Sequence, residues 1–320
     1  MAYGPAPRVE WAPDGTRLLV CIGGTIAIHA EGGALQRVAA PAGFLDARWR
    51  SDGTIVGLDS YGVLRSFTMH GALYTAEPPP PPRDAQTTFS AGALSGDGAT
   101  CVVIDDINVH VRSGQRRWRF SEHDYGINSE PGRYSAALSA DGKLLALGYQ
   151  TRAATARWSI QSGRGWLVLD MVPPRRPASS YYYEPPAQVV DRGWYEVAVS
   201  DGALRFAFDG KARRLAIAAP ERELGFGVVR VGVGEAKRAH AGGAVAVAVD
   251  ERGILAGYAV AGRVRVDYLA PQLKGPAVVE LLDTLWIDPD RAPVALALDR
   301  AGRRIACLAA DGAVEIVPVP

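Results

Sequence analysis

Hydrophobic and polar residues alternate along most of this chain, in short runs separated by turns that contain aspartate or glycine. In the segment 294–318, valine, leucine and isoleucine alternate with smaller or polar residues, and turns at 299–302 and 311–312 divide the segment into three runs. Period-two alternation between such turns is typical of antiparallel strands joined by hairpins. The segment therefore predicts a three-stranded meander.

The same pattern occurs seven times along the chain. The copies align on the small residue that closes the first turn of each: Gly15, Gly53, Gly98, Gly142, Ala212, Gly253 and Gly302. Repeats near forty residues with short strands are typical of β-propellers, in which each copy forms one blade. The sequence predicts an all-β fold: one seven-bladed β-propeller domain over residues 1–320, with four antiparallel strands in each blade.

The first strand of each copy has one large face and one small face. The positions four and six before the marker are mostly large and apolar, whereas the position five before it is alanine in five copies. We expect first strands to be innermost, with these alanines crowding the axis where the blades converge. Glu10 and Arg48 replace alanine in the first two copies, and Arg8 and Asp46 stand two residues before them. An inter-blade ion pair between Glu10 and Arg48 is the main interpretation, with a polar binding site as the alternative.

The interval from Gly142 to Ala212 is 70 residues, too short for an additional blade. It contains a segment rich in proline and tyrosine at about 173–193, which predicts an inserted loop because it cannot form a central strand. The third strand of this blade is either 156–161 or 166–170, and 196–200 is a candidate outer strand. The last copy has only three strands, and we expect Met1–Pro7 to lie along its open edge.

Composition and charge set the cellular context. A net charge of +1 gives no reason to expect nucleic acid or an anionic membrane as a partner. No apolar run approaches the ~20 residues of a membrane span, and the N-terminus does not resemble a signal peptide. Three cysteines without paired spacing favour a reducing compartment. Only four of the 35 basic residues are lysine, as expected of a GC-rich bacterial genome. The sequence predicts a bacterial cytoplasmic protein.

The turns carry a family resemblance. Ser139–Gly142, Ser51–Gly53 and Pro13–Gly15 follow first strands, and Asp311-Gly312 closes a second hairpin. This strand–turn–strand–turn–strand order resembles the WD40-like propeller families over nearly the whole chain. The chain lacks the Trp-Asp and Gly-His dipeptides of the eukaryotic pattern, so the hydrogen-bonded Asp-His tetrad of that family is not expected. The resemblance implies that the protein holds other proteins.

Catalytic motifs are absent from the sequence. No nucleophile elbow, phosphate-binding loop or zinc spacing occurs, and the five histidines are scattered over different repeats. We therefore expect no catalytic residue, no cofactor and no metal site, and we expect that the protein is not an enzyme.

The long links between blades indicate a binding face. The segments 78–88, 124–133 and 173–193 would gather on one rim around blades 2 to 5, and insertions on one face of a repeat array often mark its binding face. Aromatic residues and arginine are enriched in interfaces. The candidate partner-binding residues are Tyr181, Tyr182, Tyr183, Arg175, Arg176, Trp194, Arg83 and Tyr125.

These observations favour a non-catalytic protein-interaction scaffold or adaptor within a bacterial multiprotein assembly, whose partner is another protein. A small-ligand or sugar-binding propeller is the first alternative, and a propeller hydrolase or lyase with an axial site is the second. Tyrosines stacked in a concave pocket would favour a small ligand, whereas a flat apolar patch would favour a protein partner.

Overall fold

A computed structural model describes most of the chain. The described residues are 6–30, 33, 35–38, 43–68, 73–77, 89–105, 108–125, 127, 134–151, 163–171, 187–196, 202–222, 225–233, 240, 242–271 and 279–320.

Seven antiparallel sheets follow one another along the chain, and within each sheet the strands are paired in chain order. The bounds are β1 Arg8–Trp11, β2 Arg17–Ile22, β3 Thr25–Ala30, β4 Leu35–Arg37; β5 Phe44–Trp49, β6 Ile55–Asp59, β7 Leu64–Phe67, β8 Leu73–Glu77; β9 Ala91–Leu94, β10 Thr100–Asp105, β11 Asn108–Ser113, β12 Arg116–Ser121; β13 Tyr134–Leu138, β14 Leu144–Thr151, β15 Gly163–Asp170, β16 Gln188–Glu196; β17 Arg205–Phe208, β18 Arg214–Ala218, β19 Phe226–Arg230; β20 Ala246–Val249, β21 Leu255–Val260, β22 Arg263–Leu269, β23 Leu281–Ile287; and β24 Pro293–Leu298, β25 Arg304–Ala309, β26 Val314–Pro318. A 3₁₀ turn, η1 Glu122–Tyr125, follows β12.

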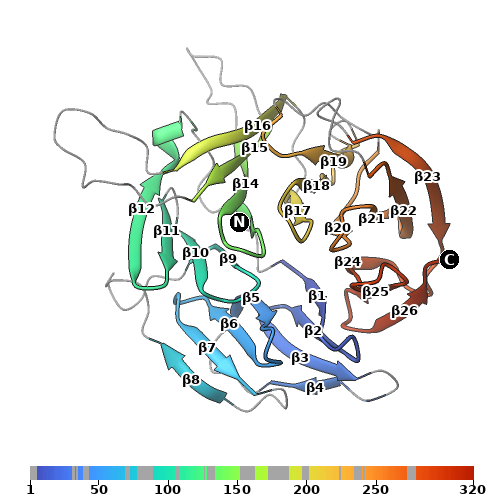
Figure 1. Cartoon of the computed structure of the whole chain (residues 1–320), viewed down its shortest axis with the longest axis horizontal. Helices are drawn as coiled ribbons and strands as arrows, with labels where there is room; N and C mark the ends of the chain where they lie inside the picture. Colours follow the sequence, from blue (N-terminus) through green and yellow to red (C-terminus); the bar gives the residue numbers. More distant parts are fainter. Residues whose placement is uncertain are drawn as a thin grey trace.

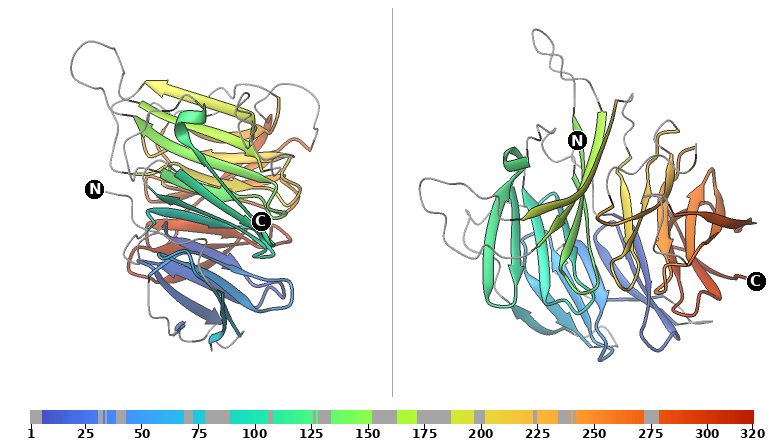
Figure 2. Two further views of the ribbon diagram at one scale, coloured as in Figure 1. Left: turned by 90° about the vertical axis from the view of Figure 1, so that its left-hand side faces the viewer. Right: turned by 45° about the horizontal axis from the view of Figure 1, so that its top comes forward.

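The sheets form the blades of a seven-bladed β-propeller, as predicted (Figure 1). The first strands β1, β5, β9, β13, β17, β20 and β24 surround the axis. Figure 2 shows the ring from two further directions. Five blades have four strands each; blades 5 and 7 have three among the described residues.

The turn after each first strand explains the sevenfold marker. All seven marker residues have positive φ, from 53° at Ala212 to 82° at Gly53. In each blade the marker N–H donates to the carbonyl three residues earlier, at 2.9–3.0 Å. Because only glycine adopts this conformation at no steric cost, the turn selects glycine in six blades.

The first-strand alanines, five residues before each marker, lie at the axis and also pack between blades: Ala137, Ala207, Ala248 and Ala297 line the axial cavity. Ala297 packs in one cluster with Val9 and Trp11 of the next blade, and Ala248 packs in another with Leu296. The sheets run outward from the axis, so side chains of a first strand alternate between the two neighbouring blades. The expected small-against-large packing therefore occurs across these two joints, while the alanines border an open axial cavity instead of filling the axis completely.

The last blade closes directly onto the first. Trp11 Nε1 donates to the carbonyl of Ala297 at 3.1 Å, and Arg304 Nη2 donates to the carbonyl of Gly15 at 2.9 Å. Ala6 and Pro7 line the axial cavity, because the chain enters the innermost strand β1 there. The expectation that Met1–Pro7 lies along the outer edge of blade 7 is wrong for these two residues, and the first five lie outside the described residues.

In blade 4 the structure decides between the two candidate third strands. Its third strand is β15, which contains 166–170 and leaves 156–161 outside the described residues. Its outer strand β16 begins at Gln188, so the inserted segment is shorter than 173–193 and the strand predicted at 196–200 starts eight residues earlier. The pairing of β15 with β16 shifts register between Val168 and Leu169, and this irregularity interrupts the alternation of apolar and polar residues along β16.

The three cysteines are buried in the second strands of their blades, β2, β10 and β25. Arg117 and Arg119 on the outer strand β12 are exposed, whereas Phe120 is buried. Among the described residues, no helix has the length and apolar character needed to cross a membrane.

Candidate binding surfaces

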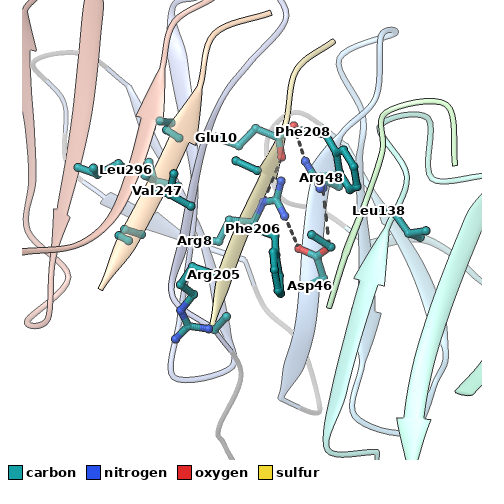
Figure 3. A pocket seen from close by; sticks show the side chains of 18 of the residues that line it. Arg8, Glu10, Asp46, Arg48, Leu138, Arg205, Phe206, Phe208, Val247 and Leu296 are labelled. Atoms are coloured by element: carbon teal, nitrogen blue, oxygen red, sulfur yellow. Dashed lines mark hydrogen bonds and ion pairs between the residues drawn. The ribbon is translucent and has the colours of Figure 1, made fainter. Parts of the chain in front are cut away.

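A cavity of about 450 Å³ follows the axis of the propeller. Its two walls differ in chemistry (Figure 3). Strands β1 and β5 contribute a charged wall, and strands β17, β20 and β24 contribute mainly apolar side chains, with Arg205 of β17 as a charged exception. The labelled apolar side chains include Phe206 and Phe208 of β17, Val247 of β20 and Leu296 of β24.

The charged wall is a four-membered ion cluster. Arg8 Nη1 lies 3.1 Å from Asp46 Oδ1, and Arg8 Nε lies 3.6 Å from Glu10 Oε2. Arg48 Nη1 lies 3.9 Å from Glu10 Oε1, and Arg48 Nε lies 3.7 Å from Asp46 Oδ2. Each carboxylate thus lies between two guanidinium groups across the boundary of blades 1 and 2, and the cluster includes the pair expected from the sequence.

Asp46 ties the cluster to a third blade. Its carboxylate accepts the backbone N–H of Ala47 at 2.9 Å and that of Leu94, on β9, at 2.8 Å. Burial raises the pKa of Asp46, and the Arg8 guanidinium opposes that shift. Two backbone donors and one guanidinium fix the orientation of this side chain between blades 1, 2 and 3.

Glu10 is held less firmly. Burial raises the pKa of Glu10 to about 7, and the nearby charge of Asp46 acts in the same direction. The Arg8 guanidinium lowers the pKa but does not outweigh the loss of solvation. Glu10 therefore exchanges its proton near neutral pH, which changes the charge of the wall.

Three polar atoms of this wall have unused hydrogen-bonding capacity. Arg8 Nε, Glu10 Oε2 and Arg48 Nε are buried and have no hydrogen-bond partner in the structure. Ion pairs at 3.6 Å and beyond are too long to count as hydrogen bonds. A polar group within the cavity could satisfy these atoms. No group of three histidine, cysteine, aspartate or glutamate residues suited to a metal ion occurs in the part of the chain that the structure describes.

The structure describes only two of the candidate partner-binding residues. Tyr181, Tyr182, Tyr183, Arg175, Arg176 and Arg83 lie outside the described residues.

Of the two that are described, Trp194 lies in β16, opposite Gly165 of β15. Tyr125 lies in η1 and is half-buried; its ring is edge-on to Phe120 at 5.5 Å, and its hydroxyl donates to the carbonyl of Ala187 at 3.2 Å. The structure thus places Tyr125 in the packing between blades 3 and 4.

An exposed apolar strand was missed by the sequence analysis. In β23, the outer strand of blade 6, Leu281, Leu282 and Trp286 are 36%, 61% and 41% exposed. The guanidinium of Arg263 lies 5.2 Å from the Trp286 ring centroid, and that of Arg265 lies 5.8 Å away. The feature of the sequence that could have indicated this surface is a fourth strand that carries apolar residues on both of its faces.

Solved structures share this fold. The chain matches Kuenenia stuttgartiensis hydrazine synthase at a TM-score of 0.60 and 13% identity, over 99% of this chain and 96% of that chain. It matches a chain of the mitotic checkpoint complex at a TM-score of 0.64 and 10% identity, over 100% and 92%. It matches the beta-propeller domain of Myceliophteria thermophila Cps50 (Swd1) at 0.58 and 11%, over 100% and 99%. At these identities the likeness shows the fold alone. No protein-family model and no curated protein sequence matches the chain.

Proposed function

We propose that this protein is a non-catalytic interaction scaffold whose partner is another protein. The observation that carries this proposal is the exposed apolar row on β23. Large apolar side chains that gather on an exposed outer strand are typical of interaction sites, since the surfaces of monomeric proteins rarely expose contiguous apolar patches. Trp286 lies beside two arginines, and tryptophan and arginine are the residues most enriched in binding hot spots.

The fold neighbours agree with this proposal at a general level. One of them is a chain of a multiprotein complex, the mitotic checkpoint complex. Another, hydrazine synthase, is an enzyme by its description, so the propeller fold by itself does not decide between scaffold and catalyst. The proposal therefore depends on the surface of this chain.

The experiment compares two pairs of exposed residues. Leu282→Ser with Trp286→Ser removes the apolar row on β23, and Leu35→Ser with Tyr61→Ser removes equally exposed residues on blades 1 and 2. Tagged protein is cross-linked in extracts of the source cells, and cross-linked peptides are identified by mass spectrometry. We expect the β23 variant to lower recovery of the partner at least tenfold, while the control variant matches wild type. Wild-type recovery by a folded β23 variant would contradict this surface.

The loop-rich face around blades 2 to 5 is a second proposed docking region. It rests on the sequence: three long links and the run Tyr181–Tyr183. A scaffold that engages one protein at this face and another at β23 would assemble a larger complex. We propose that this complex is bacterial and cytoplasmic, on the basis of the arginine-rich, lysine-poor composition and the three cysteines without paired spacing.

Binding of a small ligand in the axial cavity is a second candidate function. The specific observation in its favour is the cluster of buried polar atoms without hydrogen bonds on Arg8, Glu10 and Arg48, opposite an apolar wall. Concave sites with apolar walls and a few convergent polar groups are typical of ligand pockets. Differential scanning fluorimetry with a metabolite library tests this function. A ligand whose thermal shift disappears in Arg48→Ala would support it.

A further inference from the structure

Blade 7 ends on an open strand edge. Its sheet is β24-β25-β26, whereas both neighbouring blades carry a fourth strand, β23 in blade 6 and β4 in blade 1. Among the described residues, β26 pairs only with β25. A strand edge of this kind presents unpaired backbone groups that can template another strand.

The register shows which backbone groups are open. Val319 N–H donates to the carbonyl of Arg303, and Ala309 N–H donates to the carbonyl of Ala313. Alternate residues of an antiparallel strand direct their backbone groups to the same side. Residues 313, 315, 317 and 319 therefore bond to β25, and Val314 and Ile316 direct both N–H and C=O outward.

The edge of blade 5, the other three-stranded blade, is covered. Phe226 of β19 exchanges two backbone hydrogen bonds with His240, and Val279 N–H donates to the carbonyl of Val228 at 3.0 Å. Other segments of the chain thus occupy the position of a fourth strand there. No described residue takes this position beside β26.

The edge of β26 has less protection by charge than the edge of β12, and Pro318 limits strand pairing only at the C-terminal end of β26. The outer strand β12 carries exposed arginines, including Arg117 and Arg119, and such charges oppose strand pairing. In β26 the one charged residue is Glu315, and its carboxylate accepts the backbone N–H of Asp290. The remaining residues of the strand are apolar or proline.

Apolar side chains flank the open position on both sides. Val314 and Ile316 are half-buried against the cluster shared with blade 1. Val317 is half-buried against the cluster shared with blade 6, together with Leu285 and Ile287 of β23. A strand beside β26 would place its alternate side chains against these two groups.

We propose that β26 binds an extended segment of a partner protein as the missing fourth strand of blade 7. This inference rests on the proposed scaffold function and names the chemistry of its partner. The segment pairs antiparallel to β26, as every other fourth strand pairs with its third. It has apolar side chains on both faces and no proline opposite Val314 or Ile316, where backbone groups must pair.

A second copy of the chain fits this edge poorly. Blades 6 and 1 each extend one strand beyond the third, which is about 4.8 Å further from the axis. Two propellers that approached through β26 would meet first at β23 and β4. A single peptide strand fills the space between the two wider blades without this conflict.

The first test measures backbone hydrogen exchange at single residues. In the dilute isolated protein we expect the amides of Val314 and Ile316 to exchange at least a hundredfold faster than those of Glu315 and Val317. Slow exchange at all four positions would show that the chain covers this edge itself. Protection that appears only with dimerisation at high concentration would show that a second copy occupies it. Either result overturns the proposal.

The second test supplies a strand. A Thr-Val-Thr-Val-Thr segment is fused after Pro320 through a flexible six-residue glycine-serine linker, which gives the strand a high effective concentration. We expect at least tenfold slower exchange of Val314 and Ile316 in this fusion. The control fusion has proline at each valine and should have no effect. Equal exchange in both fusions would overturn the proposal.

A matched pair of substitutions isolates the backbone contribution. Ile316→Pro and Ile316→Ala both remove the side chain, but only proline also removes the outward N–H while leaving the bonds to β25 intact. In the valine fusion, Ile316→Pro should abolish the protection of Val314, and Ile316→Ala should retain it. If both variants retain it, the added segment does not pair with β26.

Recovery of the partner by cross-linking distinguishes this inference from the proposed function. The valine fusion should lower cross-linked recovery of the partner at least tenfold relative to the proline fusion. Unchanged recovery would overturn the inference and leave the scaffold function in place. If wild-type protein recovers no specific partner, the scaffold function itself is contradicted.

Discussion

The guanidinium of Arg304 in the last blade lies 4.3 Å from the ring centroid of Trp11 in the first blade. The same guanidinium donates to the carbonyl of Gly15. Within the chain, Arg214 of blade 5 likewise donates to the carbonyl of Gly253 in blade 6. Both arginines stand two residues after the marker of their blade. The joint that closes the ring therefore uses the same contact as a joint between consecutive blades.

Replacement of Arg304 should weaken this closing joint. Arg304→Ala removes a cation–π contact and a charged hydrogen bond, and we expect a loss of about 2–3 kcal/mol in the free energy of unfolding. Urea denaturation measures this loss. Arg303→Ala is the matched control, because the Arg303 side chain is exposed, and it should change stability by less than ~0.5 kcal/mol. Equal effects of the two substitutions would contradict the proposed role of Arg304.

The ion cluster at the axis should show energetic coupling. Arg48→Ala alone leaves Glu10 with fewer cationic neighbours in a buried site, whereas Arg48→Ala with Glu10→Ala removes both members of a pair. We expect the single Arg48 variant to be less stable than the double variant, with a coupling free energy of about 1 kcal/mol or more. Denaturation of all four members of the cycle measures the coupling. Additive losses would refute the pairing.

Stability should depend on pH through Glu10. Burial raises its pKa in the folded protein from 4.5 to about 7, so the folded state binds the proton more tightly than the unfolded state. Stability from this group is present below about pH 4.5 and is lost as the pH rises to about 7, by on the order of 1–3 kcal/mol.

The variant Glu10→Gln isolates this contribution. It keeps the shape of the side chain but cannot ionise, so its stability should change less than that of wild type between pH 5 and pH 8. The measurement is the midpoint of urea denaturation at several pH values in that range. Parallel pH profiles of the two proteins would show that Glu10 is not the group responsible.

Two glycines with the same backbone requirement should respond differently to substitution. Gly142 and Gly312 both have positive φ, 68° and 88°. A Cβ at Gly142 would lie 2.6 Å from Thr100 Oγ1, whereas a Cβ at Gly312 would meet no atom within 4 Å. Gly312→Ala should cost about 1–2 kcal/mol from the backbone alone, and Gly142→Ala should cost measurably more. Thermal denaturation compares them, and equal losses would show that the Thr100 contact relaxes freely.

The tyrosine run offers a test of the loop-rich face. Tyr181, Tyr182 and Tyr183 replaced by serine should lower capture of a partner at that face, since loss of one aromatic hot spot typically costs ~2 kcal/mol or more. The melting temperature should not change, because the run lies outside the repeated strands. Cross-linking of the folded triple variant measures capture. Recovery at the wild-type level would place the docking face elsewhere.

The fold could be predicted because its signals are local. A positive φ at the marker selects glycine in six blades, and this leaves a visible period in the sequence. Alternation, however, shows only which residues share a face, not what that face contacts. The position of Ala297 at the axis could therefore be predicted, but its packing against Val9 and Trp11 of the next blade could not.

The binding surfaces depend on strand pairing and on the position of each strand in the ring, which a single sequence does not show. Residues 156–161 alternate and residues 166–170 are an apolar run that ends in aspartate, so both patterns fit a strand. Only the pairing of β15 with β14 decides between them. The exposure of Leu282 and Trp286 depends on the position of β23 at the rim. The outward backbone groups of Val314 and Ile316 have no strand partner among the described residues, because no fourth strand pairs with β26 there.

The closing joint has a consequence for synthesis in the cell. The indole N–H of Trp11 donates to the carbonyl of Ala297, which lies 286 residues later in the chain. At a synthesis rate of roughly 5–20 residues per second, the ribosome needs about 15–60 s to make that interval. During this time the apolar side of the first blade, including Val9 and Val20, has no last blade to cover it. The first blade of the nascent chain therefore keeps an apolar face open to aggregation until the ring is complete.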